Sequence, residues 1–99
     1  MGAETFYETS FGKTPDEAFS NAVANAAYEY GHSGYTGSIA EKTCYTMATH
    51  EIMTDSQADK LSESLIETKY SDKWGPAGCI EIQSTSDQKK YLFFGWASS

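Results

Sequence analysis

Residues 78–97, GCIEIQSTSDQKKYLFFGWA, carry the pattern that decides the fold. Apolar and polar residues alternate in residues 78–84 and again in residues 90–97, and the polar segment TSDQK separates the two runs. A period of two is typical of a β-strand, and a short polar connection predicts an antiparallel hairpin. Phe93, Phe94 and Trp96 make both faces of the second strand apolar, which places it either at the centre of a sheet or at an interface.

Two helices are predicted upstream of this hairpin. Thr14-Pro15-Asp16-Glu17 combines a capping residue, a proline suited to the first turn and a glutamate three residues after the cap. Small apolar residues then recur every three or four positions, so we expect a helix over residues 15–30. Residues 54–57 repeat the capping pattern and predict a second helix that ends near Tyr70.

Two further segments are expected to be strands. Residues 4–11, ETFYETSF, alternate with a period of two, and residues 43–49, TCYTMAT, are rich in β-branched and aromatic side chains, with residues 38–40 as a candidate extension. The resulting order is β-α-β-α-β-β. It predicts an α+β fold, a two-layer sandwich with two helices on one face of a mixed sheet, formed by a single domain over residues 1–99.

The charge of the chain excludes several classes of partner. Fourteen acidic residues face seven lysines, no arginine is present, and the formal net charge is −7. Such a field repels nucleic acid and anionic lipid, and arginine is the residue that usually captures phosphate with two hydrogen bonds. We therefore expect no nucleic-acid partner and no membrane partner.

Catalytic and metal-binding signatures do not emerge from the sequence. His32 and His50 lack the spacing of a zinc site, and no serine or cysteine lies in a recognisable nucleophile motif. Cys44 and Cys79 are far apart and are expected to be free, buried thiols of a cytoplasmic protein, or of the host cytoplasm if the protein is viral. We expect neither an enzyme nor a cofactor.

A glycine-punctuated segment between the first helix and the next strand is the first candidate for a binding site. Glycine allows backbone N–H groups to approach an anion, hydroxyl groups add donors, and an aromatic ring offers a stacking surface. The segment does not match a phosphate-binding loop, and a simple turn into the strand is the alternative explanation. Its candidate ligand-binding residues are Gly31, His32, Gly34, Tyr35, Thr36, Gly37 and Ser38.

Lys42 and Trp74 complete the candidate site. Lys42 follows the glycine-rich segment and would supply a positive charge, although a surface lysine is the ordinary interpretation. Trp74 lies beside Gly75 and Pro76 in a predicted loop, where an indole either anchors a ligand or covers the end of the core.

The stretches GYTGSIAEK (residues 34–42) and KWGPAG (residues 73–78) resemble elements of small uncharacterised proteins of bacterial viruses and mobile elements. This resemblance covers a small part of the chain and transfers no activity to any residue. It implies a compact viral accessory protein, for example one that acts against host defence.

Two functional hypotheses follow from these observations. The first is a non-enzymatic small-ligand binding protein, a counter-defence sponge that sequesters a nucleotide-type immune signal. The alternative is an acidic inhibitor that binds a host defence protein through its negative surface. In either case Phe93, Phe94 and Trp96 predict a homo-oligomer, because one face of a two-layer domain would not bury all three.

Overall fold

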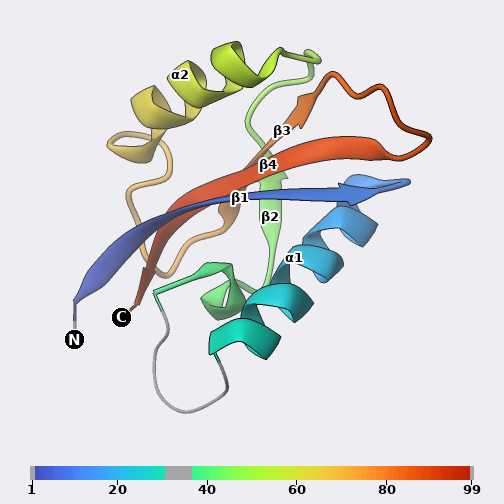
Figure 1. Cartoon of the computed structure of the whole chain (residues 1–99). Coiled ribbons are helices and arrows are strands. Elements are labelled where there is room, and N and C mark those ends of the chain that lie inside the picture. Colours follow the sequence, from blue (N-terminus) through green and yellow to red (C-terminus); the bar gives the residue numbers. More distant parts are fainter. Residues whose placement is uncertain (1, 31–36, 99) are drawn as a thin grey trace.

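A computed structural model describes residues 2–30 and 37–98. The order β-α-β-α-β-β and the α+β class are confirmed (Figure 1). The strands are β1 (Ala3–Gly12), β2 (Tyr45–Met47), β3 (Ala77–Ile82) and β4 (Lys89–Ser98), and the helices are α1 (Pro15–Tyr30), α2 (Asp55–Ile66) and a short 3-10 helix, η1 (Ile39–Glu41).

The four strands form one mixed sheet in the order β1-β4-β3-β2. β4 runs antiparallel to both β1 and β3, whereas β2 runs parallel to β3. The predicted hairpin is therefore confirmed, and β4 takes the central position that its two apolar faces indicated. Phe93 pairs with Glu8 of β1 and with Cys79 of β3, which defines the register of β4 against both of its neighbours.

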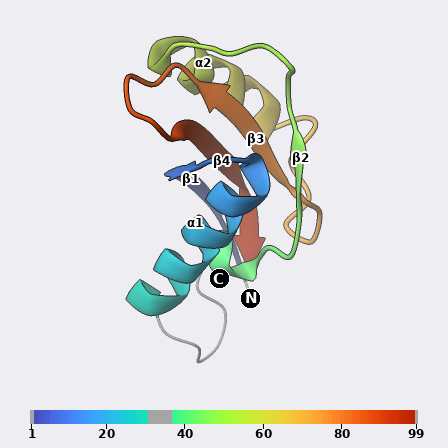
Figure 2. The same ribbon diagram turned by 90° about the vertical axis from the view of Figure 1, so that its right-hand side faces the viewer.

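The prediction that both helices share one face of the sheet is wrong. The buried alanines of α1 pack with Phe6, Cys79 and Phe93, whereas α2 packs with Ile80, Leu92 and Phe94. Because neighbouring residues of a strand point to opposite faces, these two clusters lie on opposite sides of the sheet. Figures 1 and 2 show α1 and α2 separated by the strands. The reason is physical: both faces of β3 and β4 are apolar, so each face needs a helix.

This arrangement removes the aromatic argument for association. Phe93 and Phe94 are both fully buried within one chain, one beneath each helix. Trp96 is half-buried, and its Nε1 donates a hydrogen bond to the carbonyl of Ile66 at 2.8 Å. A homo-oligomer remains a prediction, but these three side chains no longer supply its cause.

The helix starts match the capping patterns of the sequence. Thr14 Oγ1 accepts a hydrogen bond from the Glu17 N–H at 3.2 Å. At α2, Thr54 Oγ1 accepts from the Gln57 N–H at 3.2 Å, and Gln57 Oε1 accepts from the Thr54 N–H at 3.1 Å, which completes a capping box. α2 ends at Ile66 rather than near Tyr70, because the chain turns there and the Tyr70 N–H bonds to the Leu65 carbonyl.

The strand predicted over residues 43–49 contracts to three residues, and its candidate extension is not a strand. Residues 38–41 form the cap and body of η1, in which Ser38 Oγ accepts a hydrogen bond from the Ala40 N–H at 3.3 Å. This local side-chain bond favours a helical turn over an extended chain. Among the described residues, neither helix is both long and apolar enough to cross a bilayer.

Gly78 allows a close contact on the α2 side of the sheet. A Cβ atom at this position would lie 2.4 Å from Cζ of Phe94, the residue opposite it on β4. The ring of Phe94 thus occupies the space that any larger residue would need. The absence of a side chain at residue 78 is what allows a phenylalanine at residue 94.

Candidate functional site

Lys42 is a buried residue that emerges from the end of η1. Only 5% of its surface is exposed, and its Cε lies 3.7 Å from the Cβ position of Gly95 on β4. The aliphatic stem therefore crosses the α1 side of the sheet, next to Phe6, and directs the ammonium group toward the loop that precedes β3.

The ammonium group of Lys42 holds residues 72–75, here called the Trp74 loop. Its Nζ donates to the carbonyls of Gly75 at 2.7 Å, Lys73 at 3.0 Å and Asp72 at 3.5 Å. Burial lowers the pKa of Lys42, and the charges of Asp72 and Cys44 act in the opposite direction. Three carbonyl acceptors match the three donors of an ammonium group, so a buried charge is hydrogen-bonded here and fixes the loop backbone.

The loop is further ordered by its own hydrogen bonds. The Trp74 N–H donates to Asp72 Oδ1 at 2.8 Å, and the Gly75 N–H donates to the Asp72 carbonyl at 3.1 Å. These bonds define a tight turn that is capped by an aspartate side chain. Trp74 is thus carried on a rigid support.

Trp74 itself faces outward, with 66% of its surface exposed. The Nζ of Lys73 lies 5.3 Å from the centre of the indole ring and 3.4 Å from the carbonyl of Gly2. The ammonium group of Lys73 therefore lies over one face of a largely exposed indole ring. The rest of the ring can stack on a planar ligand, and the charge can neutralise a negative group.

The residues that the sequence singled out are partly brought together. Gly31, His32, Gly34, Tyr35 and Thr36 lie outside the described residues. Gly37 has a φ of 68° and donates its N–H to the Ser98 carbonyl at 2.7 Å, while Ser38 caps η1. The end of the glycine-rich segment and the Trp74 loop therefore meet through Lys42. The ammonium of Lys42 is bound by backbone carbonyls, and the cation next to Trp74 is Lys73, which was not among the predicted site residues.

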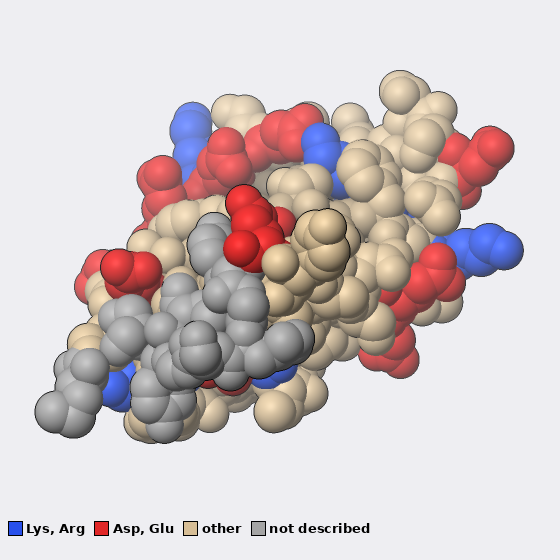
Figure 3. All heavy atoms as spheres, turned by 60° about the horizontal axis from the view of Figure 1, so that its bottom comes forward, with Lys and Arg blue, Asp and Glu red and all other residues tan. Residues whose placement is uncertain are grey.

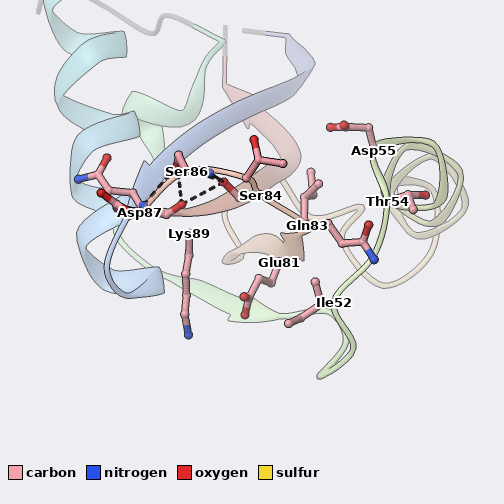
Figure 4. A pocket seen from close by; sticks show the side chains of 12 residues that line it. Ile52, Thr54, Asp55, Glu81, Gln83, Ser84, Ser86, Asp87 and Lys89 are labelled. Atoms are coloured by element: carbon pink, nitrogen blue, oxygen red, sulfur yellow. Dashed lines mark hydrogen bonds between the residues drawn. The ribbon is translucent and has the colours of Figure 1, made fainter.

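A second region was not anticipated from the sequence. A hollow of about 640 Å³ lies between the β3–β4 connection and the segment that precedes α2 (Figure 4). Asp55, Glu81 and Asp87 line it together with the hydroxyls of the connection, and Lys89 is the lysine among its lining residues. Met53 pairs with Ile82, one of the lining residues, and no motif within a single segment predicts a pairing of that kind. Its acidic lining disfavours a phosphate group.

A third region combines Tyr45 with Asp16 at the α1–β2 contact. The Tyr45 hydroxyl donates a short hydrogen bond to Asp16 Oδ1, and Cys44 lies beside them in a shallow groove. Burial raises the pKa of Tyr45, and the hydrogen bond and charge of Asp16 raise it further. The phenol therefore keeps its proton, which is the opposite of what an activated nucleophile requires.

The two cysteines are free, but only one is buried as expected. Cys79 is buried, and burial followed by the charge of Glu81 raises its pKa to about 12. Cys44 is exposed, because it lies just before the short strand β2 rather than within a longer one. Across residues 2–30 and 37–98, no group of three or more His, Cys, Asp or Glu side chains is placed to hold a metal ion.

Comparison with protein-family models, with curated proteins and with solved structures found no match to this chain.

Proposed function

We propose that this chain is a non-enzymatic binding protein that holds a planar, negatively charged small molecule of the nucleotide type on Trp74. The observation that supports this proposal most strongly is the use of a buried lysine to fix a loop whose indole is 66% exposed. A buried lysine, Lys42, therefore orders a loop whose indole lies mostly outside the hydrophobic core.

The energetic argument concerns preorganisation. An indole on a fixed loop loses little conformational entropy when a ligand stacks on it, so more of the contact energy appears as affinity. Stacking of a base on an aromatic side chain contributes about 1–3 kcal/mol, and Lys73 adds an attraction for phosphate. In a viral setting such a protein would act as a sponge that removes a nucleotide signal without altering it.

The experiment is a thermal melt of the protein with a panel of cyclic and ADP-ribose-type nucleotides. Binding to the folded state adds RT ln(1 + [L]/Kd), about 2.7 kcal/mol at a hundredfold excess over Kd, which shifts the melting temperature of a domain of this size by about 10–20 °C. Trp74→Ala should abolish the shift and leave the unliganded melt unchanged. Tyr28→Ala is the matched control, because Tyr28 is 94% exposed on α1.

The alternative, an acidic inhibitor of a host defence protein, is favoured by the surface charge. Figure 3 shows acidic side chains at several separate places on one side of the molecule. If no nucleotide shifts the melt and a host protein co-purifies and is released by salt, the inhibitor hypothesis replaces the sponge.

A further inference from the structure

β1 forms one edge of the sheet and is long for an edge strand. All ten of its residues pair with β4, and no proline or bulge interrupts them, while no strand of the described chain pairs with its other side. An edge of this kind presents unpaired backbone N–H and C=O groups, which form a template for another strand. At the opposite edge, β2 is only three residues long.

The sheet surface beside this edge is apolar and incompletely covered. Tyr7 pairs with Phe94, so it lies on the α2 side of the sheet, and Phe11 follows four residues later on the same side. α2 packs over β3 and β4. As a result Tyr7 is 45% exposed and Phe11 is 43% exposed.

Carboxylates flank the edge on both faces. On the α2 side, burial raises the pKa of Tyr7, and the nearby charges of Glu63 and Glu67 raise it further. On the α1 side, burial and the charge of Glu29 raise the pKa of Glu8. Carboxylates therefore flank the middle of the edge strand on both faces, whereas lysines lie near its ends: Lys73 next to Gly2, and Lys89 and Lys90 opposite Gly12 and Phe11.

We propose that the free edge of β1 binds an extended, lysine- or arginine-rich segment of a partner protein, which adds to the sheet as a further strand. Backbone hydrogen bonds hold the segment, its apolar side chains cover Tyr7 on the α2 side, and its basic side chains on the α1 side meet Glu8 and Glu29. Asn21 Nδ2 already donates to the Phe11 carbonyl at 2.9 Å, so the segment lies mainly along residues 3–10.

Charge selects this occupant over a second copy of the chain. Two copies paired through β1 would bring both sets of flanking glutamates together, and each copy carries a net charge of −7. The lysine or arginine side chains of a basic strand would instead be attracted to these glutamates. The inference concerns a surface that does not include Trp74, so it stands or falls independently of the nucleotide proposal.

The test uses a capped peptide of eight alternating lysine and valine residues, titrated into the whole protein by calorimetry. We expect saturable one-to-one binding that weakens as salt increases. Two control peptides separate the contributions: a glutamate–valine peptide reverses the charge, and a lysine–valine peptide with N-methylated alternate amides keeps the charge but cannot form the strand. Neither control should bind measurably.

Variants of the protein then locate the site. Tyr7→Ala and the pair Glu8→Gln with Glu29→Gln should each weaken binding about tenfold. Tyr28→Ala and Asp87→Asn change an exposed aromatic residue and an exposed carboxylate elsewhere, and they should leave binding unchanged. Circular dichroism confirms that each variant is folded.

Three results would overturn the proposal. One is the absence of saturable binding at about 1 mM peptide, and another is equal binding of the N-methylated peptide, which would reduce the effect to charge alone. The third is a dimer in sedimentation that Tyr7→Ala dissociates, because a second copy would then occupy the edge.

Discussion

α1 and α2 cover opposite faces of one sheet, but they do so with different completeness. α1 buries Ala18, Ala22 and Ala26 against the sheet, and η1 and the stem of Lys42 extend the same layer. α2 buries Ala58, Ser62 and Ile66 and leaves the outer part of its face, at Tyr7 and Phe11, open to solvent. The two faces therefore differ in how completely they are covered, although each buries a large aromatic side chain.

The largest expected effect tests whether the two faces contribute equally to stability. Phe93→Ala removes a fully buried ring from the α1 face, and Phe94→Ala removes one from the α2 face. Each should lower the free energy of unfolding by about 3–5 kcal/mol, measured by urea denaturation, because each leaves a large cavity.

Gly78→Ala sharpens this test, because Gly78 contacts Phe94 on the α2 face only. In the natural sequence the added methyl group should destabilise by about 1–3 kcal/mol through overpacking. In the Phe94→Ala background this cost should largely vanish. An equal cost in both backgrounds would contradict the contact.

Lys42→Met tests the support that the α1 face gives to the Trp74 loop. The substitution removes the donor for three carbonyls, and we expect a loss of about 1–3 kcal/mol in the free energy of unfolding. Lys89→Met, at an exposed lysine, should change stability by less than about 0.5 kcal/mol.

When Trp96 is replaced by Phe, Trp74 is the remaining tryptophan, and its fluorescence reports whether Lys42→Met releases the Trp74 loop. A released loop should lower the anisotropy of Trp74 and weaken nucleotide binding. Unchanged anisotropy in Lys42→Met would show that the bonds within the loop are sufficient to hold the indole.

Cys79 provides a pH test of burial on the α1 face. Its pKa is raised from 9.0 to about 12, so between these values the folded state keeps a proton that the unfolded state has lost. Stability must therefore fall as the pH rises through this window, by about 2 kcal/mol at about pH 10.5. Cys79→Ala should remove the fall that begins near pH 9 and leave the part above pH 10 to which Tyr45 contributes, whereas Cys44→Ala, at an exposed thiol, should leave the profile unchanged.

The smallest effect concerns the start of α2. Thr54→Ala removes one half of a capping box and should lower the free energy of unfolding by about 1 kcal/mol, whereas Thr54→Ser should retain most of the stability. Thermal denaturation of the two variants measures the difference. Equal destabilisation by Ala and Ser would show that the hydroxyl of Thr54 does not cap the helix.

Local patterns predicted most of the secondary structure because their causes are local. The capping residues Thr14 and Thr54 and the alternation in residues 78–84 and 90–97 determined where helices begin and which segments become strands. One error arose where distant contacts decide the outcome, because the placement of α1 and α2 on opposite faces depends on packing across the sheet. The end of α2 at Ile66 and the helical turn at residues 38–41 have local causes that were not recognised in the sequence.

The candidate site was predictable only in part. Trp74 was recognisable because glycine and proline follow it in a loop, and Lys42 because it follows the glycine-rich segment. The role of Lys42 was not recognisable, because three carbonyls more than 29 residues away in the sequence bind its ammonium group. No pattern within a single segment encodes such a contact.

The sequence by itself determined the α+β class, the order of the elements and the two apolar faces of β4, because these follow from local periodicity and composition. Only the tertiary structure decided that α1 and α2 take opposite faces, that Lys42 is buried beneath the Trp74 loop, and that Tyr7 and Phe11 remain exposed beside a free edge. Each of these depends on which distant surfaces meet, and long-range packing has no signature in the order of neighbouring residues.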